Sequence, residues 1–519
     1  MIVIAGTMMS PEAVQTRIGV AVAALIMIVF GLFELHSAGD ELNITQGFVG
    51  QTPVTIFRPR NAAPTPVIVI AHGFAGSQQL MQPFAETLAR NGYLAVTFDF
   101  LGHGRNPVPM RGDITEGETI TAELLGELAD VVSFARKLPG ADGRVAVLGH
   151  SMASDIVVRF AKTNPDVDAT VAVSVFSPVA TAKAPRNLLV IVGALEPAML
   201  RNEGLRIVNL GAGGTAIAGE TYGNFADGTA RKLVLARGVE HIGVLYSRDS
   251  MVAALRWVNA AFGRQQEGFV DSRGRWLALV FLGVVALAWP LSALLPVASE
   301  TLAGAGLGWR PLLIVAFAPA ALTPLLLWKM PTDFLPILLG DYLMLHFLLY
   351  GVLTALMLRM LRDHTSAVAS PPVSWRAIAI AATAVAAYNI LAFGLPIDAY
   401  VFSFLPIPAR VPLIVAIACG TLPYFLADEW LSRGVESRRG AYALTKFCFL
   451  LSLAIAVTLN PMKLFFLVII VPVILLMFLG FGLVSRWSYA ATHHPLPGAL
   501  ANAAVFAWGI AVTFPMIVR

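Results

Sequence analysis

The stretch Arg144-Val-Ala-Val-Leu148, followed directly by Gly149-His150-Ser151-Met152-Ala153, decides the fold of the first half of the chain. An apolar run, a short turn centred on a serine and a helical stretch together form the pattern of a nucleophile elbow. Such a turn is strained, so a large side chain two positions before or after the serine would strike the neighbouring strand or helix. Gly149 and Ala153 are small, although alanine stands where this motif usually has a second glycine. A buried strand followed by a chance serine is the alternative interpretation.

Two further apolar runs precede the elbow, and each ends in a loop that contains glycines. Residues 66–71 lead into His72-Gly73-Phe74-Ala75-Gly76-Ser77, and residues 94–98 lead into Asp99-Phe-Leu-Gly-His-Gly104. The first loop allows backbone N–H groups to point at one spot, as an oxyanion hole requires. Because helix-length segments separate the runs, we expect βαβ units, a parallel sheet and functional residues at the carboxyl ends of its strands.

Residues 42–265 resemble the α/β-hydrolase superfamily, specifically its lidless esterases and dienelactone-hydrolase-like members. The motifs that carry the resemblance, in the order in which the family has them, are His72-Gly73, Asp99 with Gly102 and Gly104, and the elbow at Ser151. The resemblance implies an α/β fold, with a mostly parallel sheet and helices on both faces. It also implies a catalytic triad in which an acid and then a histidine follow the serine.

The chain holds one good candidate for each of the two missing triad members. Residues 188–192 resemble a next-to-last strand, and they lead into Gly193-Ala-Leu-Glu196-Pro197, where the family carries its acid. Residues 232–236 resemble the last strand, and His241 follows it after a short loop. We therefore expect Glu196 as the acid and His241 as the general base.

Other polar residues near these loops have structural explanations. Glu240 is adjacent to the histidine, but adjacent side chains diverge, and Glu203 lies on an expected helix beyond the acid. His103 and His150 lie near the expected pocket mouth, where they would face the substrate or support the triad. The segment 176–187 is too short for the cap domain that lipases commonly insert there, so we expect an open pocket.

The three expected catalytic side chains are needed together. A serine hydroxyl is a poor nucleophile at neutral pH, so His241 would take its proton during attack and return it to the leaving group. Glu196 would fix the histidine tautomer and stabilise the imidazolium. The backbone N–H groups of Met152 and of the Phe74 region would hold the developing oxyanion. The residues expected to shape the elbow and the neighbouring loops are His72, Gly73, Gly149, Ala153 and Asp99.

Composition indicates more than a soluble enzyme. With 57% hydrophobic residues, 13% charged residues and a mean hydropathy of +0.73, the chain of 519 residues cannot be one water-soluble globule. Apolar runs long enough to cross a bilayer are expected at 18–35, 276–297, 312–328, 336–358, 377–396, 411–428, 443–460, 464–485 and 498–517. We predict a membrane anchor within residues 1–39, an α/β-hydrolase domain over 40–265 and an all-α transmembrane bundle of about eight helices over 270–519.

Basic residues near the ends of these spans and between them predict the orientation. If the span count is right, the following fall on one side: Arg17, Arg359, Arg362, Arg376, Arg433, Arg438, Arg439, Lys446 and Arg486. Short cytoplasmic loops are enriched in Lys and Arg, so the hydrolase-like domain would lie on the opposite face. A cleaved signal peptide at 18–35 would leave it there too, but the long apolar core favours a retained anchor. We therefore expect a multi-pass protein of a bacterial inner membrane with a periplasmic hydrolase domain.

Some polar residues fall within or beside the expected spans. Asp341, His346 and Asn389 would be costly there unless they face a bundle interior or water. We interpret them as helix-packing contacts, and a proton or substrate path is the alternative. The stretch Asp428-Glu429-Trp-Leu-Ser-Arg433 resembles a degenerate E-E-x-x-x-R motif of intramembrane CAAX-type proteases, but it lacks the membrane histidines that follow in that family. We interpret it as a charged cluster at the cytoplasmic end of a helix.

The sequence points to no cofactor, metal or nucleic-acid partner. Cys419 and Cys448 lie within or beside apolar spans and suggest neither a disulfide nor a metal site. The net charge of +4 comes mainly from the loops on the expected cytoplasmic side, and no Walker, Rossmann or zinc-finger pattern is present. The expected partners are the lipid bilayer and a small-molecule or lipid-derived ester.

Our hypothesis from the sequence is a membrane-bound serine hydrolase that cleaves carboxylic esters. An acyltransferase that passes the acyl group to an alcohol or a glycan would use the same triad and is the first alternative. A non-catalytic binding module on a transporter-like bundle is the second. The elbow, acid and base in the family's order favour an enzyme, because a binding module has no physical need for all three.

Overall fold

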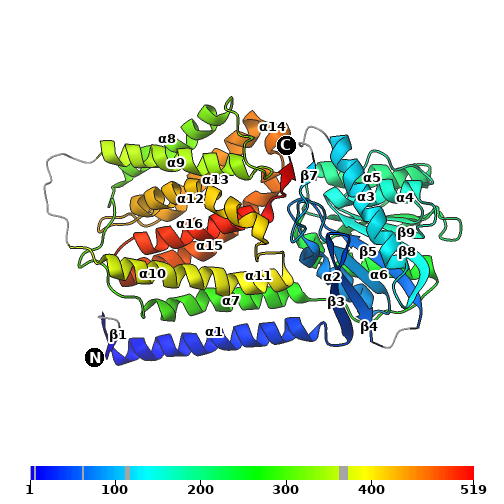
Figure 1. Ribbon diagram of the computed structural model, residues 1–519, viewed down its shortest axis with the longest axis horizontal. Coiled ribbons are helices and arrows are strands. Elements are labelled where there is room, and N and C mark those ends of the chain that lie inside the picture. Colours follow the sequence, from blue (N-terminus) through cyan, green and yellow to red (C-terminus); the bar gives the residue numbers. More distant parts are fainter. Residues whose placement is uncertain (1, 5–6, 61–62, 112–116, 362–371, 519) are drawn as a thin grey trace. The chain divides into compact units, whose positions relative to one another are not determined.

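The computed structural model describes residues 2–4, 7–60, 63–111, 117–361 and 372–518 (Figure 1), and the chain divides into two compact units. The first, which we call the sheet unit, combines residues 31–278 with the short segments 396–407 and 513–519. The second, the helical unit, combines residues 1–30, 279–395 and 408–512. The sheet unit therefore includes two segments that are distant in sequence from the predicted hydrolase domain.

Within the described residues, the sheet unit is built on nine strands in the order β11-β12-β10-β9-β8-β5-β6-β4-β3. Their bounds are β3 Leu42–Val49, β4 Thr52–Pro59, β5 Thr65–Ala71, β6 Leu94–Phe98, β8 Ala141–His150, β9 Ala169–Val173, β10 Leu188–Gly193, β11 Thr221–Tyr222 and β12 Arg231–Ala236. The strands from β12 to β6 pair in parallel, and β4, β3 and β11 join the edges antiparallel. This mostly parallel sheet confirms the predicted fold class.

Helices cover both faces of the sheet (Figure 1). The helices are α2 Gln82–Arg90 and α6 Arg248–Phe262 on one face, and α3 Gly117–Arg136, α4 Met152–Thr163 and α5 Ala198–Ala212 on the other. In β10, Leu189 and Ile191 pack into the apolar core beneath α2 and α6, whereas Val190 and Val192 pack against α4 and α5. Successive strand residues point to opposite faces, so burial of both faces requires the continuous apolar runs seen in the sequence.

The helical unit consists mainly of long apolar helices. Their bounds are α1 Pro11–Ser37, α7 Arg273–Ser292, α8 Trp309–Leu327, α9 Gly340–Met360, α10 Trp375–Tyr388, α11 Gly394–Tyr400, α12 Val411–Ser432, α13 Ala441–Leu459, α14 Pro461–Leu464, α15 Leu467–Thr492 and α16 Leu496–Thr513. A π-helical turn joins α10 to α11, and in the described part of the chain nine helical segments are long and apolar enough to cross a membrane. The sequence predicts the same number.

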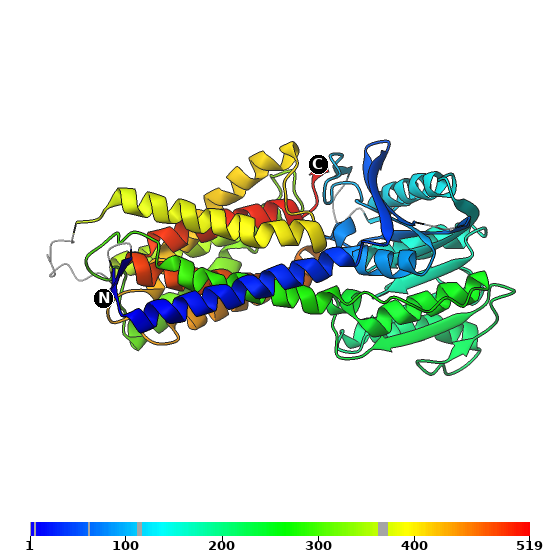
Figure 2. The same cartoon turned by 90° about the horizontal axis from the view of Figure 1, so that it is seen from below.

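Glycines let the helices of this unit approach closely. A Cβ atom on Gly420 of α12 would lie 2.1 Å from the carbonyl oxygen of Met344 in α9, and one on Gly283 of α7 would lie 2.8 Å from the side chain of Ile28 in α1. Figure 2 shows α1, in blue, running beside α7. Arg17 near the start of α1 donates to the carbonyl oxygen of Trp289 at 2.9 Å. Small residues at such crossings are typical of helix packing in membranes.

The charged stretch at the end of α12 is buried and paired. Glu429 accepts hydrogen bonds from Arg433 at 3.1 Å, from Ser485 at 2.7 Å and from Asn502 at 3.3 Å. Asp428 forms an ion pair with Lys446 of α13. These bonds join α12 to α13, α15 and α16, and they satisfy groups that would otherwise be costly in a bilayer.

Some sequence expectations for this unit were wrong in detail. Lys446 and Arg486 were expected in loops, but they lie within α13 and α15, the first buried and the second exposed. Arg362 lies outside the described residues. Asp341, His346 and Asn389 are all buried, as packing positions require.

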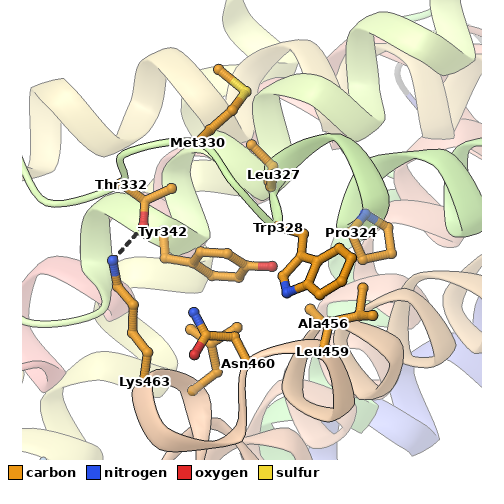
Figure 3. Close-up of a pocket in the computed structure, with 11 residues that line it drawn as sticks. Pro324, Leu327, Trp328, Met330, Thr332, Tyr342, Ala456, Leu459, Asn460 and Lys463 are labelled. Carbon is orange, nitrogen blue, oxygen red and sulfur yellow. Dashed lines mark hydrogen bonds between the residues drawn. The ribbon is translucent and has the colours of Figure 1, made fainter.

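A small cavity lies near the end of α8 in the helical unit, with a volume of about 20 Å³ (Figure 3). Trp328, Tyr342 and Asn460 line it together with Lys463, which donates to the hydroxyl of Thr332 at 2.9 Å. A cavity of this size holds about one water molecule. It is therefore too small to be a substrate site.

Candidate active site

Ser151 lies on the sharp turn between β8 and α4. Its backbone has φ 55° and ψ −119°, a conformation that L-residues rarely adopt. The N–H of Ser151 donates to the carbonyl oxygen of Val173 at 2.8 Å, which ties the turn to the neighbouring strand. A Cβ atom on Gly149 would lie 2.3 Å from the carbonyl oxygen of Ala153, so only glycine fits there. Ala153 itself is fully buried.

The structure brings the three expected catalytic side chains into one hydrogen-bonded chain. Nε2 of His241 lies 3.0 Å from Oγ of Ser151, and Nδ1 of His241 lies 2.8 Å from Oε2 of Glu196. These are the distances that a general base and its orienting acid require. The Glu196 side chain is fully shielded from solvent, and that of His241 is 14% exposed.

Glu196 is held by two further hydrogen-bond donors. Its Oε1 accepts a hydrogen bond from the backbone N–H of Gly193 at 2.8 Å and another from Oγ of Ser174 at 2.7 Å. Ser174 follows the last residue of β9 and has φ 55°, which turns the chain out of the strand. Together the bonds leave Oε2 aimed at His241.

The other polar residues have supporting contacts. Nε2 of His150 donates to the carbonyl oxygen of His241 at 2.9 Å, and burial together with the neighbouring His241 holds the pKa of His150 well below its usual range. Glu240 accepts from the N–H groups of the two residues after His241, at 2.7 and 2.8 Å. Glu203 pairs with Arg206 at 2.7 Å. Both glutamates therefore have partners other than the imidazole ring of His241.

The loop expected to form the oxyanion hole lies directly against the nucleophile. A Cβ atom on Gly73 would lie 2.8 Å from Cβ of Ser151, so a side chain cannot be placed there. Ala75 has φ 55°, and the N–H of Gly76 donates to the carbonyl oxygen of Gly73 at 3.1 Å, so the loop is a tight turn. Met152 is the first residue of α4, and the first N–H groups of a helix have no partner inside it.

His72 and Asp99 hold these loops in place. The N–H of Phe100 donates to Nε2 of His72 at 3.1 Å, so the ring proton is on Nδ1, which lies 2.8 Å from the carbonyl oxygen of Gly73. Burial lowers the pKa of His72, in agreement with this neutral form. Asp99 accepts from the N–H of Gln78 at 2.8 Å. His103 contacts the ring of Phe74, with centroids 6.1 Å apart.

Glu127 of α3 supports the loop that follows Asp99. Its carboxylate accepts from the N–H of Leu101 at 2.8 Å, from the amide of Asn106 at 2.8 Å and from the hydroxyl of Thr52 at 2.5 Å. Burial nevertheless raises the pKa of Glu127 from 4.5 to about 7, because desolvation outweighs these three bonds. The folded protein therefore holds a proton here at pH values where the unfolded chain has lost it.

This raised pKa predicts a loss of stability as the pH rises. The contribution of Glu127 to the free energy of unfolding is fully present below pH 4.5, and it is lost as the pH rises through about 7. We expect the midpoint temperature of thermal inactivation to decrease when the pH is raised from about 5 to about 8. In Glu127→Gln this decrease should be smaller. Asp130→Asn, at an exposed position on the same helix, is the matched control. An equal fall in wild type and Glu127→Gln would contradict the prediction.

Among the described residues, no group of three or more His, Cys, Asp and Glu side chains is placed to hold a metal ion. The expected absence of a metal or cofactor stays a prediction.

Comparison with known proteins agrees with the fold. Residues 62–205 match the family model Hydrolase_4, described as serine aminopeptidase, S33. No curated protein matches the chain.

Similar solved structures cover somewhat less than half of the chain. A putative dienelactone hydrolase from Klebsiella pneumoniae subsp. pneumoniae MGH 78578 is 16% identical, with 43% of this chain and 98% of that chain covered and a TM-score of 0.32. The protein TT1662 from Thermus thermophilus is 15% identical, with 43% and 99% covered and a TM-score of 0.33.

The family match contains the elbow, and the sheet around it has parallel central strands with helices on both faces. The chain thus carries an α/β-hydrolase domain of the serine-hydrolase type, joined to a region of long apolar helices.

Proposed function

We propose that this protein is a membrane-bound serine hydrolase that cleaves carboxylic esters. The observation that carries the proposal is the continuous chain of hydrogen bonds from Ser151 through His241 to Glu196, built on a strained elbow. Strain of this kind persists only where the surrounding structure imposes it, and it is common at catalytic residues. A buried serine with a structural role needs neither the strain nor a histidine and a carboxylate behind it.

The reaction follows from these positions. Oγ of Ser151 attacks the ester carbonyl carbon while its proton passes to Nε2 of His241. The N–H of Met152 and a backbone N–H of the loop at Phe74 hold the negative oxygen of the tetrahedral intermediate. His241 then gives the proton to the leaving alcohol, and the carbon–oxygen bond of the ester breaks. Water, deprotonated by His241, then attacks the acyl carbon. The bond from this carbon to Oγ of Ser151 breaks, Oγ takes the proton back from His241, and the acid is released.

The surroundings of the triad favour an apolar acyl group. Phe176, Leu195 and Met199 are 54%, 66% and 50% exposed, and all three follow strands at the carboxyl edge of the sheet, close in sequence to Ser174 or Glu196. Segments that follow parallel strands carry the ligand contacts in α/β folds, so exposed apolar side chains there favour an apolar substrate group. The substrate class is therefore an ester with an alkyl acyl chain, from a small molecule or a lipid.

The membrane topology supports an extracytoplasmic active site. With Arg17 inside and nine spans in the described chain, the residues outside the spans at 38–272, 401–407 and 514–518 fall on the outer face. These segments make up most of the sheet unit. The proposal therefore assigns the hydrolase domain to the outer face of a bacterial inner membrane.

Product analysis tests the proposed reaction. Membranes that contain the protein are incubated with p-nitrophenyl butyrate, with and without a candidate acceptor alcohol. We expect butyrate as the product and a rate of p-nitrophenol release that the alcohol leaves unchanged. Faster p-nitrophenol release together with a new butyrate ester would show an acyltransferase instead. If membranes with the protein released no more p-nitrophenol than membranes without it, the proposed esterase activity would be contradicted.

A further inference from the structure

The loop at the expected oxyanion hole is hydrogen-bonded to a segment more than 300 residues further along the chain. The N–H of Ser403 donates to Oγ of Ser77 at 2.9 Å, and Oγ of Ser403 donates to Oε1 of Gln79 at 3.0 Å. Ser77 also donates to Oε1 of Gln79 at 2.8 Å, and Nε2 of Gln79 donates to the carbonyl oxygen of Asp398 at 3.3 Å. Ser403, Ser77 and Gln79 therefore share one network.

Asp398 gives the remote segment its own fixed shape. Its Oδ1 accepts from the N–H groups of Phe404 and Leu405 at 2.9 and 2.8 Å. Its Oδ2 forms an ion pair with Arg105 at 2.6 Å, and the N–H of Arg105 donates to Asp99 at 3.0 Å. The segment 396–407 is thus tied both to the loop at residues 72–77 and to the loop that follows Asp99.

These contacts are buried, so losing one is costly. Ser77, Gln79 and Ser403 are 1%, 4% and 2% exposed, and Asp398 is 9% exposed. A hydrogen bond in a site without water is strengthened, and a polar atom left unpaired there is strongly unfavourable. The network therefore favours a single arrangement of the loop.

The loop is held at both of its ends. At one end Gly73 packs against Ser151, where a Cβ atom would come within 2.8 Å. At the other end Ser77 accepts the hydrogen bond from Ser403. The backbone between them includes Ala75 in the left-handed region, a conformation that persists only if its surroundings impose it. The direction of the N–H groups near Phe74 therefore depends on both anchors.

We propose that Ser403 is a positioning residue for the oxyanion hole: its hydroxyl holds the side chain of Gln79, which in turn accepts from Ser77. This inference rests on the proposed function. Oxyanion donors stabilise the transition state only when they lie about 2.7–3.1 Å from the developing charge, and misplacement by about 1 Å is costly. Residues 401–407 connect the apolar helical segments Trp375–Tyr400 and Pro408–Ser432, and Asp398 lies in the last turn of the first. The catalytic loop thus takes part of its shape from the chain between two candidate membrane spans.

The test uses the full-length protein in membranes and compares Ser403→Ala, Gln79→Ala and the double variant on p-nitrophenyl butyrate. We expect kcat to fall about tenfold in each single variant with KM nearly unchanged, less than the 10²–10³-fold loss from removing a whole donor. The double variant should fall little further, because both changes break the same network. Ser403→Thr keeps the hydroxyl and should restore most of kcat.

A matched control separates positioning from general loosening. Nε2 of Gln82 donates to the carbonyl oxygen of Ala399 at 3.3 Å, and its Oε1 accepts from Arg273 at 2.6 Å. Gln82→Ala therefore removes a bond to the same segment and one to Arg273, but none to the loop. We expect its kcat to stay within about twofold of the wild type. Amide hydrogen exchange of residues 73–77, which needs no substrate, should be about tenfold faster in Ser403→Ala than in Gln82→Ala.

Three results would overturn the inference. Equal kcat in wild type and Ser403→Ala, with turnover still dependent on Ser151, would remove the positioning role and leave the proposed function intact. Equal losses in Ser403→Ala and Gln82→Ala, with equal exchange, would show a merely structural role. A wild type whose turnover does not depend on Ser151 would overturn the proposed function and the positioning role with it.

Discussion

Ser151→Ala is expected to abolish ester hydrolysis, with kcat falling by about a millionfold to the level left by binding alone. Alanine keeps the backbone of the elbow but removes the only atom that can form the acyl-enzyme. His241→Ala should cost about as much, because Oγ of Ser151, 3.0 Å from Nε2, then has no group to take its proton. The double variant should be no worse than either single one, since the residues act as a unit.

Ser154→Ala is the matched control for this prediction. Ser154 lies three residues further on, and both its N–H and its hydroxyl donate to the carbonyl oxygen of Ser151. Its N–H keeps that bond in the variant, so kcat should stay within about threefold of the wild type. Release of p-nitrophenol is the measurement, and full activity in Ser151→Ala would show that another residue is the nucleophile.

Glu196→Gln is the second large effect that we expect, a loss of about 10³–10⁴ in kcat. The glutamine can donate its amide N–H to Nδ1 of His241, so Nδ1 would have to accept this hydrogen bond. The ring proton would then be on Nε2, and Nε2 could not take the proton of Ser151. Ser174→Ala removes one of the two donors to Oε1 and should lower kcat only about tenfold, with the carboxylate still present.

Glu203→Gln and Glu240→Gln test whether the acid is correctly assigned. Glu203 pairs with Arg206, and Glu240 accepts from backbone N–H groups beside His241. Both variants should keep at least about a third of the wild-type kcat. If either lost about 10³-fold while Glu196→Gln stayed active, the acid of the triad would be a different residue from the one proposed.

Local patterns in the sequence were sufficient to predict the sheet and the three catalytic candidates. The central strands are buried on both faces, so each is a continuous apolar run. Ser151 follows one of these runs directly, and Glu196 and His241 follow two others within five residues. Ser174 could not be found in this way. A single serine after a strand has no pattern of its own, and its partner Glu196 is defined only by the pairing of β9 with β10.

The segment 396–407 escaped prediction for a related reason. Hydropathy reports which residues avoid water, and this segment lies between two apolar runs, so it was expected to be an ordinary connection. Its contacts with Ser77 and Gln79 are polar and span more than 300 residues. No periodicity records a contact of that kind.

The long helices were predictable in number but less so at their ends. The span expected at 464–485 continues to Thr492 in α15, because exposed Arg486 sits on the outside of the helix without ending it. Lys446 was expected in a loop because it is charged, but its ion pair with Asp428 allows it to lie buried in α13. A charged residue therefore does not by itself mark the end of a membrane helix.

The central claim, an activated serine at position 151, is tested most directly with a membrane-impermeant fluorophosphonate probe. Intact cells that express the wild type or Ser151→Ala are labelled, and the modified peptide is identified by mass spectrometry. We predict one covalent adduct, on Ser151, formed in intact cells and absent from the variant. Labelling of the wild type only after lysis would contradict the extracytoplasmic position, and no adduct on Ser151 under either condition would contradict the catalytic triad.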